Sequence, residues 1–248
     1  AKLELSGARD SRRLLVSGTD MTGRTHDLNG LVKLSAGSDH VAIDADGFVV
    51  PKKAGATVVK VVVGQKSLDV PVVVKDVTNH PVSFVREVIP AISKAGCNAG
   101  TCHGAQKGKR GFKLSLRGYD PLYDYRALVD DLSGRRFNRS RPEQSLMLLK
   151  PTQGVPHEGG FLFDETSRTY QLLRQWIAEG CRFDNAKRVS RIEVFPKKPL
   201  LETTDSQQQL IVVAHFPDGT SRDVTREAVF ETSNFEVATV NGSGLIAA

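Results

Sequence analysis

The chain has few of the residues from which a large enzyme core is usually built. Of its 248 residues only 6% are aromatic, one of them tryptophan, and only two residues are methionine and three cysteine. Glycine is frequent, with 22 residues, and valines recur in short runs. This composition favours small β-rich modules with tight turns over one large enzyme core, and the length is sufficient for two or three of them.

Long apolar runs are also missing. Residues 58–63 form one of the longest, but Lys60 interrupts it, and it falls far short of the ~20 residues that a membrane-spanning helix needs. The first residues alternate in polarity like a strand, so we expect no leader peptide in this sequence. If the protein is exported, its signal lies outside the printed residues.

Several enzyme signatures have no counterpart in the chain. The histidines form no triad with a serine in a nucleophile elbow, and the sequence has no glycine-rich phosphate loop. It also lacks a pair of carboxylates in a recognisable hydrolase pattern. Hydrolysis and nucleotide chemistry are therefore not expected, and attention turns to the cysteines.

One short segment carries the strongest chemical signal. Cys97, Cys102 and His103 lie together, with four residues between the two cysteines. In a covalent haem attachment site, two thiols add to the vinyl groups of haem, and the histidine directly after the second cysteine binds the iron. The usual spacing is two residues. We therefore predict a haem c site with an enlarged loop, and we expect the small residues Ala99 and Gly100 to allow the backbone to bulge.

Two other interpretations of this segment stay open. Cys97 and Cys102 could form a disulfide, with His103 a bystander. The same residues could bind zinc, with Cys181 as a third sulfur ligand, because cysteine and histidine are preferred zinc ligands. However, a structural zinc site normally takes four ligands in paired short spacings, and the chain has no second pair of closely spaced cysteines.

The net charge of the chain is +6, and basic residues cluster at 107–110 and 135–141 on either side of the middle of the sequence. Neither stacking aromatic residues nor a recognition helix accompanies them, so nucleic acid is excluded as a partner. We interpret the clusters as a solvated face, or as groups that neutralise the haem propionates or dock an acidic redox partner.

Helical patterns surround the cysteine segment. Val85, Val88, Ile89 and Ile92 recur at helical spacing and predict a helix that leads into it, with Pro90 either as an interruption or as the helix start.

Three more helices are predicted further along. Asp120 before Pro121 is a good pair of N-cap and first-turn residues. Pro142 can open a second helix that carries residues 146–149, and a third runs from about residue 166 to 179 with one apolar face.

The two ends of the chain repeat one another at an offset of 196 residues. The matching pairs are Gly23 and Gly219, Asp27 and Asp223, Val41 and Val237, Ala42 and Ala238, and, after one extra residue, Gly47 and Gly244. Each copy has short apolar stretches with period-two alternation, separated by Asp-Gly turns. We therefore predict a small antiparallel β-sandwich at each end, over residues 1–76 and 190–248.

The second copy is shorter than the first. Its last residue, Ala248, corresponds to Pro51, so the copy lacks counterparts of the strand-like runs at 57–63 and 68–74. A sandwich without two strands would leave an open sheet edge. We expect the sequence to be a fragment of a longer polypeptide, with completion by another chain as the alternative.

The flanks resemble the bacterial immunoglobulin-like group 2 domains. The resemblance is carried by Phe-Pro-Asp-Gly-Thr-Ser-Arg-Asp-Val-Thr at 216–225 and Val-Ala-Thr-Val at 237–240, whereas residues 21–28 of the first copy depart from it. In that family the domains act mainly as cell-surface spacers or adhesion modules. The resemblance therefore implies a scaffold.

The middle of the chain resembles the cytochrome c domains of large planctomycete surface proteins, which immunoglobulin-like modules often accompany. The matching stretches are 97–104, 145–151, 155–160 and 173–180. The resemblance implies a small all-α cytochrome c-like domain with one covalent haem c that acts in electron transfer. The enlarged cysteine loop departs from the commonest form of the motif.

The second axial ligand of the iron is the other open choice. Many cytochromes c place a methionine in a loop before the last helix, but the corresponding loop here, residues 150–163, contains His157 and no methionine. We expect His157 to bind the iron opposite His103. The runners-up are Met147, within a leucine-rich helix, and Cys181, directly after the last helix; an open or water-bound iron is the remaining alternative.

Taken together, the patterns predict an all-α cytochrome c-like domain at 80–184 between two immunoglobulin-like β-sandwiches at 1–76 and 190–248, the second truncated. The expected function is that of an exported c-type cytochrome module, periplasmic or at the cell surface, more an electron carrier than a catalyst. The alternatives are a haem enzyme or gas sensor with an open distal site, and a haem-free surface adhesion protein. An acidic redox protein is the expected partner.

Overall fold

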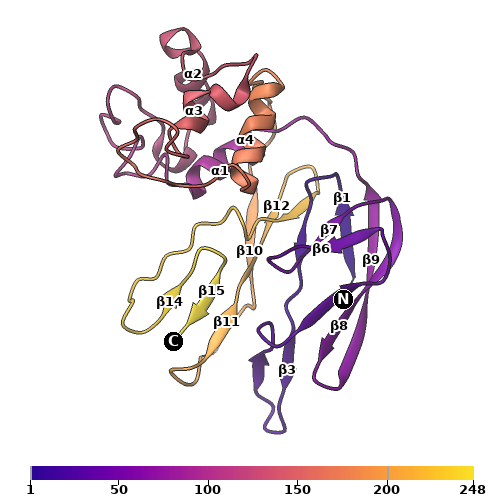
Figure 1. Ribbon diagram of the computed structural model, residues 1–248. Coiled ribbons are helices and arrows are strands. Elements are labelled where there is room, and N and C mark those ends of the chain that lie inside the picture. Colours follow the sequence, from indigo (N-terminus) through magenta and orange to yellow (C-terminus); the bar gives the residue numbers. More distant parts are fainter. Residues whose placement is uncertain (1, 200) are drawn as a thin grey trace. The chain divides into compact units, whose positions relative to one another are not determined.

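The computed structural model describes residues 2–199 and 201–248; the predicted first residue of the first sandwich lies outside the described residues. The chain folds into two compact units. The central unit comprises Pro81–Arg188, and the flanking unit combines Ala1–His80 with Val189–Ala248. Figure 1 shows the α-helices in the central unit and the strands in the flanking unit.

The predicted fold class is wrong. Across the part of the chain that the structure describes, helix accounts for only 18% of the residues, and the four α-helices are short. Strands in several small sheets make up most of the regular structure. An all-α cytochrome c-like domain between two sandwiches is therefore not what the chain forms. The helical patterns are real but brief, because glycine ends both α1 and α4, and most of the residues between the helices form turns and loops.

Nine strands form the described part of the first copy of the repeat, residues 2–76. They are β1 (Leu3–Ser6), β2 (Arg12–Arg13), β3 (Ser17–Thr19), β4 (Thr25–Asp27), β5 (Lys33–Ala36), β6 (Val41–Ile43), β7 (Phe48–Pro51), β8 (Gly55–Val63) and β9 (Lys66–Asp76). Their sheets have the orders β1-β9-β8-β5, β2-β7-β6 and β3-β4, and β1 runs parallel to β9.

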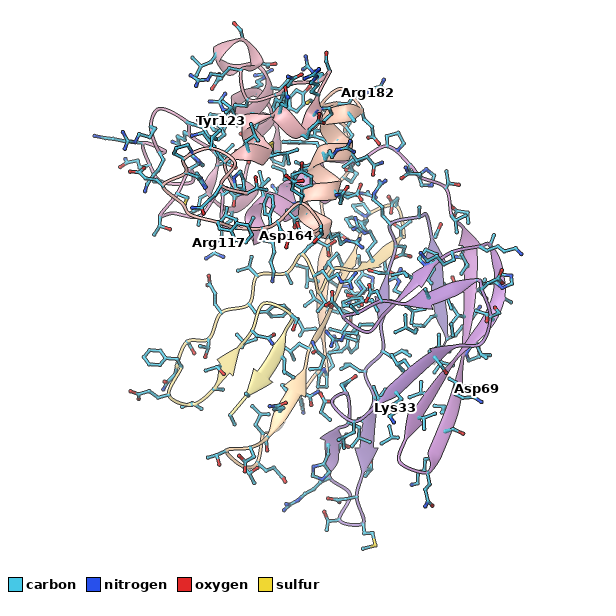
Figure 2. All side chains as sticks on the ribbon, viewed as in Figure 1. Lys33, Asp69, Arg117, Tyr123, Asp164 and Arg182 are labelled. Atoms are coloured by element: carbon cyan, nitrogen blue, oxygen red, sulfur yellow. The ribbon has the colours of Figure 1, made fainter. Side chains whose placement is uncertain are left out.

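The alternating valines of the long hairpin β8–β9 build the core of this copy. Val59 and Val61 on β8 and Val72 on β9 are buried in one hydrophobic cluster. On the same sheet, Lys33 and Asp69 are exposed (Figure 2). The period-two pattern seen in the sequence thus separates a buried from a solvated face, as expected for a strand that is covered on one side.

Among residues 190–199 and 201–248, the second copy has six strands, in two sheets of three. They are β10 (Arg191–Phe195), β11 (Gln207–Gln209), β12 (Ile211–His215), β13 (Ser221–Asp223), β14 (Thr239–Val240) and β15 (Leu245–Ala247). The order β11-β15-β14 reproduces β2-β7-β6 of the first copy, and the pair β12-β13 reproduces β3-β4. The repeat in the sequence is therefore also a repeat in strand order.

The two copies contact each other through equivalent residues. The Asp27 carboxylate accepts a hydrogen bond from the backbone N–H of Gln209 at 2.5 Å, and the Asp223 carboxylate accepts one from the backbone N–H of Arg13 at 2.8 Å. At the offset of 196, Asp27 corresponds to Asp223 and Arg13 to Gln209. Each copy thus gives the other the same bond, as subunits do across an interface with two-fold symmetry.

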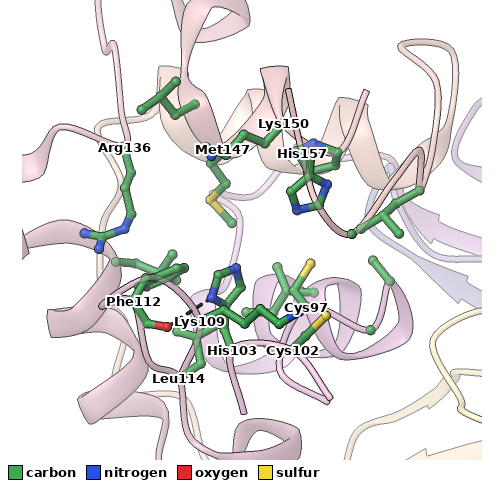
Figure 3. A pocket seen from close by; sticks show the side chains of 18 of the residues that line it. Cys97, Cys102, His103, Lys109, Phe112, Leu114, Arg136, Met147, Lys150 and His157 are labelled. Atoms are coloured by element: carbon green, nitrogen blue, oxygen red, sulfur yellow. Dashed lines mark hydrogen bonds between the residues drawn. The ribbon is translucent and has the colours of Figure 1, made fainter. Parts of the chain in front are cut away.

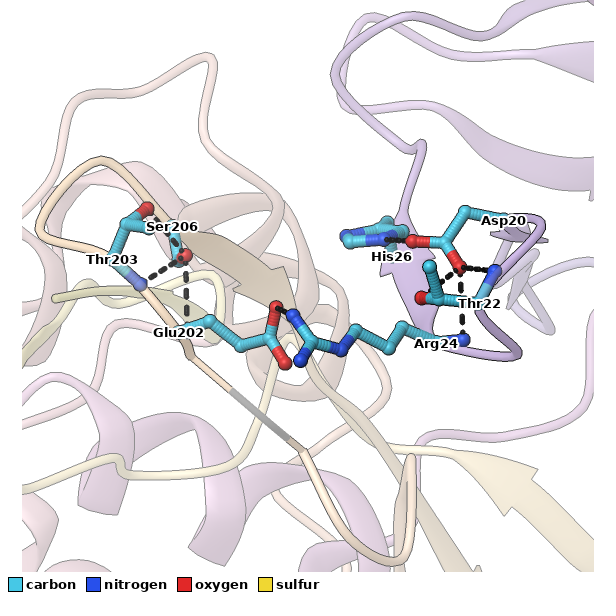
Figure 4. A network of polar contacts seen from close by, with 7 residues as sticks. All are labelled: Asp20, Thr22, Arg24, His26, Glu202, Thr203 and Ser206. Carbon is cyan, nitrogen blue, oxygen red and sulfur yellow. Dashed lines mark hydrogen bonds and ion pairs between the residues drawn. The ribbon is translucent and has the colours of Figure 1, made fainter.

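A further contact between the copies lies at the turn that joins β3 to β4 (Figure 4). Asp20 accepts hydrogen bonds from the backbone N–H groups of Thr22 (2.8 Å) and Arg24 (3.1 Å) and lies 2.8 Å from Nε2 of His26. Hydrogen bonds from the Thr22 hydroxyl and from His26 lower the pKa of Asp20. Arg24 then pairs with Glu202 of the second copy at 3.2 Å.

Short helices of three types form the central unit. They are the π-helix η1 (Phe84–Val88), α1 (Ile89–Lys94), the 3-10 helix η2 (Leu116–Gly118), α2 (Pro121–Val129), the 3-10 helices η3 (Asp131–Gly134) and η4 (Pro142–Gln144), α3 (Leu146–Leu149) and α4 (Arg168–Ala178). No helix among residues 2–199 and 201–248 is both long and apolar enough to cross a membrane.

The predicted helix start at Asp120 is confirmed. Asp120 caps α2 by accepting a hydrogen bond from the backbone N–H of Tyr123 at 3.0 Å, and Pro121 is the first helical residue, where an N–H group would need no partner inside the helix. Pro90 lies in the first turn of α1, but η1 continues into α1 with helical backbone at Val88 and Ile89. Pro90 therefore lies where the π-helix changes to the α-helix, and it does not interrupt the helical run.

The single tryptophan anchors the core of the central unit. Trp176 on α4 is fully buried, and its indole N–H donates to the backbone carbonyl of Arg182 at 2.9 Å. The rings of Phe84 and Phe137 lie with centroids 5.2 and 5.4 Å from that of the indole. Because α4 packs on η1 in this way, the helix that precedes the cysteine segment is fixed in place.

Candidate functional site

The central unit contains a cavity of about 320 Å³, a size typical of small-molecule sites. Cys97, Cys102 and His103 line one wall, and Met147 and His157 line the opposite wall (Figure 3). Five of the six predicted site residues therefore meet at one cavity, although up to 60 residues of sequence separate them.

The end of α1 places the first cysteine. Gly96, with φ of 79°, adopts the left-handed conformation that ends the helix. Its N–H donates to the carbonyl of Ser93 at 3.0 Å, and the N–H of Cys97 donates to the carbonyl of Ile92 at 2.9 Å. These two bonds form a Schellman motif. Cys97 is therefore held directly by the helix terminus.

The enlarged loop between the cysteines folds into consecutive turns. The N–H of Cys102 donates to the carbonyl of Ala99 at 2.9 Å, and the N–H of His103 donates to the carbonyl of Cys97 at 3.0 Å. The second bond closes the loop by joining its two ends. Four intervening residues therefore return the chain to the same wall of the cavity.

The glycine that this loop requires is not the one expected from the sequence. A Cβ on Gly100 would meet only a methyl group of Leu116, at 3.7 Å, whereas a Cβ on Gly104 would overlap the backbone carbonyl oxygen of Asn98. Gly104 directly follows His103. The glycine after the motif therefore has no room for a side chain, whereas the glycine inside the motif has room for one.

Both cysteines at the cavity are free thiols, as is Cys181. Burial, with a smaller contribution from the neighbouring Cys102, raises the pKa of Cys97 to about 12. Cys97 is therefore a neutral thiol at physiological pH. Across the described part of the chain, no three histidine, cysteine or acidic side chains lie close enough together to hold a metal ion among themselves.

A backbone carbonyl orients the imidazole of His103. Its Nδ1 lies 3.0 Å from the carbonyl oxygen of Phe112, shown by the dashed line in Figure 3. Because a carbonyl can only accept, Nδ1 carries the proton and Nε2 keeps a free lone pair. Burial lowers the pKa of His103, which keeps the ring neutral at physiological pH. The ring therefore has the tautomer that a metal-binding histidine needs.

His157 is oriented in the same manner from the opposite wall. Its Nδ1 lies 2.9 Å from the carbonyl oxygen of Gly160, so Nε2 is again the nitrogen with a free lone pair. Gly159 passes beneath the ring, since a Cβ there would lie 2.7 Å from the imidazole. Glu158 pairs with Arg110 at 3.1 Å and ties the loop to the other wall.

The runner-up ligands differ in their positions. Met147 on α3 directs its thioether into the same cavity as His157 (Figure 3). Cys181 follows Gly180 at the end of α4 and is fully buried in the hydrophobic core, outside the set of residues that line the cavity. Burial also raises the pKa of the Cys181 thiol.

The two basic clusters of the sequence meet at this cavity. Five basic side chains line it, against one carboxylate, Glu158; they are Lys109, Arg110, Arg135, Arg136 and Lys150. Arg136 is only 9% exposed, and its guanidinium stacks 4.0 Å from the centre of the Phe112 ring. It lies across the cavity from Cys97 and Cys102 (Figure 3).

Positive charge is concentrated in the central unit as a whole. This unit has 18 basic and 11 acidic residues, a net charge of +7, whereas the flanking unit has a net charge of −1. The cavity therefore lies in the unit that attracts anions.

Sequence reasoning missed Asn98, Gly104 and the two carbonyls that orient the imidazoles. A backbone carbonyl has no residue signature, so Phe112 and Gly160 could not be recognised as partners of histidines. The chain matches no protein-family model and no curated protein sequence. Its function is therefore argued from the site.

Proposed function

We propose that the central unit is a c-type electron-transfer module. Cys97 and Cys102 bind one haem covalently, and His103 and His157 are its axial ligands. One observation carries the proposal: two imidazoles face one cavity from opposite walls, each with Nδ1 held by a backbone carbonyl and Nε2 left free, beside two free thiols. This is the arrangement that haem c requires of its protein.

The remaining lining residues fit the two edges of a haem. Its vinyl groups and its carboxylates lie on opposite edges, and the cavity has thiols on one side and the buried Arg136 on the other (Figure 3). A guanidinium is the side chain best suited to pair with a carboxylate. Ile92, Leu128 and Leu173 belong to the apolar lining of the same cavity.

Each residue of the site has a separate task. The thiols would hold the cofactor at one edge, and the N–H···O bonds to Phe112 and Gly160 orient the two rings and leave each Nε2 free to bind the iron. When bound, haem supplies one-electron chemistry at its iron. With His103 and His157 on both faces, no position is left for a substrate, which favours electron transfer over oxygen or peroxide chemistry.

The proposal does not depend on a cytochrome fold. The support comes from the side chains and carbonyls at one cavity, and function resides in such sites more than in the overall fold. The sequence resemblance to planctomycete cytochrome c domains adds to it, and it suggests an exported protein. The net charge of +7 in the central unit suggests an acidic redox partner.

The test is expression in the bacterial periplasm together with a cytochrome c maturation system. We expect the purified protein to gain the mass of one haem that survives acid extraction, with a six-coordinate low-spin absorption spectrum in both oxidation states. Cys97→Ala with Cys102→Ala should abolish covalent attachment, and Cys181→Ala should keep it.

Three results would contradict this function. Haem that is fully removed by acid would exclude thioether bonds, and a protein without haem would favour a haem-free surface module. Rapid carbon monoxide binding by the resting reduced protein would indicate an open distal site, as in a gas sensor or haem enzyme.

A further inference from the structure

We propose that Asn98 is the positioning residue of the enlarged attachment loop, and that it decides whether Cys102 forms its thioether bond. This inference rests on the proposed function. It concerns how a loop with two extra residues can still present both thiols to one cofactor.

Asn98 is fully buried although it is a polar residue in the loop between the two cysteines. Burial of an amide is unfavourable unless hydrogen bonds replace its contacts with water. Here Nδ2 donates to the hydroxyl of Ser93 on α1 at 2.8 Å and the backbone carbonyl accepts from the N–H of Arg117 in η2 at 3.0 Å, whereas Oδ1 is buried without a hydrogen-bond partner. Asn98 therefore fastens the loop to two other elements of the unit.

The neighbouring backbone is shaped around this residue. Gly104 has no room for a Cβ because the Asn98 carbonyl occupies that space. Gly118, with φ of 70°, brings η2 close to Asn98, since a Cβ there would lie 3.6 Å from Nδ2 and would overlap Ile89. Two glycines thus allow close approach to a single buried side chain and its carbonyl.

The two cysteines depend on Asn98 to different degrees. Cys97 is held by the Schellman motif at the end of α1, upstream of Asn98. Cys102 lies beyond it, and its N–H bonds to Ala99, the residue that follows Asn98. A longer loop has more conformations to lose when both ends are fixed. Asn98 removes that freedom before attachment, because its side chain is already buried.

The bond-forming step is an addition. Each thiol sulfur bonds to one carbon of a vinyl group, and the thiol hydrogen ends on the other carbon, so nothing leaves and no oxidant is needed. Once the first sulfur is attached, the second must reach a fixed point on the same edge. A mobile Cys102 would then miss its vinyl group, and the product would carry one thioether bond.

The experiment uses the full chain, matured in the periplasm as above. The variant Asn98→Leu keeps the branched shape of the side chain and removes its hydrogen bond to Ser93, and Ser93→Ala removes only the partner of Nδ2. Thr101→Ala is the matched control, because Thr101 is exposed in the same loop. The reduced pyridine haemochrome spectrum distinguishes haem with two thioether bonds from haem with one, and peptide mass mapping identifies the cysteine.

We expect the fraction of bound haem with a single thioether, through Cys97, to rise several-fold in Asn98→Leu and to a smaller extent in Ser93→Ala, with no change in Thr101→Ala. The fraction is measured per bound haem, so a loss of folded protein alone would not change it. If the Asn98→Leu protein does not accumulate in the cell, the fraction of haem with a single thioether bond in Ser93→Ala decides whether Asn98 has this role.

Two thioether bonds in both variants, at the level of the unchanged protein, would overturn the role of Asn98. Absence of covalent haem from the unchanged protein would instead overturn the proposed function.

Discussion

The two imidazoles at the cavity are oriented by the main chain. His103 bonds to the carbonyl of Phe112 and His157 to that of Gly160, and both histidines therefore expose Nε2. No side-chain substitution removes these acceptors directly. The clearest tests at the scale of single residues replace the imidazole itself or the glycines that let the backbone approach.

The distal ligand can be tested by His157→Ala. Covalent attachment should persist, because the cysteines are unchanged, while the low-spin spectrum of two imidazoles should be lost. The reduction potential should rise, because two imidazoles stabilise ferric haem. Absorption spectroscopy and potentiometry measure both effects. Met147→Leu is the control, since its side chain lines the same wall; if it changes the spectrum and His157→Ala does not, Met147 is the ligand.

Replacing Gly104 or Gly100 by alanine should change the free energy of unfolding by different amounts. Gly104→Ala forces a Cβ against the carbonyl of Asn98, and we expect a loss on the order of 1–3 kcal/mol, as for overpacking of an interior. Gly100→Ala has room and should stay within about 0.5 kcal/mol of the parent. Denaturant unfolding followed by the fluorescence of Trp176 reports on the central unit alone. Equal effects of the two changes would contradict the crowding at Gly104.

At the scale of elements, caps and stops decide where each helix of the central unit lies. α1 and α4 both end in a Schellman motif, at Gly96 and Gly180, and in each a cysteine follows the glycine. The outcomes differ. Cys97 lines the cavity, whereas Cys181 enters the core. The same local signal thus places two thiols in different environments, because the packing of the helices differs.

The start of α4 depends on Ser167. Its hydroxyl accepts a hydrogen bond from the backbone N–H of Tyr170 at 3.1 Å. Ser167→Ala should lower the free energy of unfolding of the central unit by about 1 kcal/mol. Arg174→Ala, an exposed change on the same helix, should have an effect within about 0.5 kcal/mol. Trp176 fluorescence in urea would measure both, and an equal loss in the two variants would argue against the cap.

A charged cluster on β10 makes the flanking unit sensitive to acid. Hydrogen bonds from Arg191, then Lys197, and also His215 lower the pKa of Glu193 from 4.5 to about 2. A lowered carboxylate pKa contributes stability above pH 4.5 that disappears as the pH falls towards 2.

The variant Glu193→Gln tests this contribution. It should unfold at a lower temperature than the parent at neutral pH, and the difference should vanish between pH 4.5 and 2. Scanning calorimetry resolves the transition of the flanking unit. A difference that is constant across this range would show that the carboxylate charge is not its cause.

In the whole molecule, the net charge differs between the two units, whereas both copies of the repeat belong to one unit. The central unit has a net charge of +7 and the flanking unit −1. The two copies of the repeat, although far apart in sequence, belong to one compact unit and exchange equivalent bonds between Asp27 and Gln209 and between Asp223 and Arg13. The cavity and the positive charge lie together in the other unit.

The charge of the central unit predicts selectivity among redox reagents. An anionic reagent such as ferricyanide should oxidise the reduced haem protein faster than a neutral oxidant of similar potential, and its rate should fall as salt is added. Lys107→Glu with Lys109→Glu should lower the rate with the anionic reagent several-fold, and Lys187→Glu, away from the cavity, should change it less. Stopped-flow absorbance measures these rates. Insensitivity to salt would argue against an acidic docking partner.

The success and failure of sequence reasoning follow from the range of the interactions involved. The start of α2 was predictable because Asp120 and Pro121 act on the residues next to them. The all-α fold class was wrong because a short attachment motif and brief helical patterns do not determine how the loops between them fold. The choice between Gly100 and Gly104 failed for a related reason, since only the folded loop shows where Asn98 lies.

Residue types and near neighbours were enough to predict which groups are available for chemistry, where several helices begin and end, and that the two ends are copies of one module. These properties depend on residue type and on neighbours within a few positions. The tertiary structure alone decided that His157, Met147 and two distant basic clusters meet Cys97 and Cys102 at one cavity, and that carbonyls orient the imidazoles. Such contacts join segments tens of residues apart, and they exist only once the packing around Trp176 has brought those segments together.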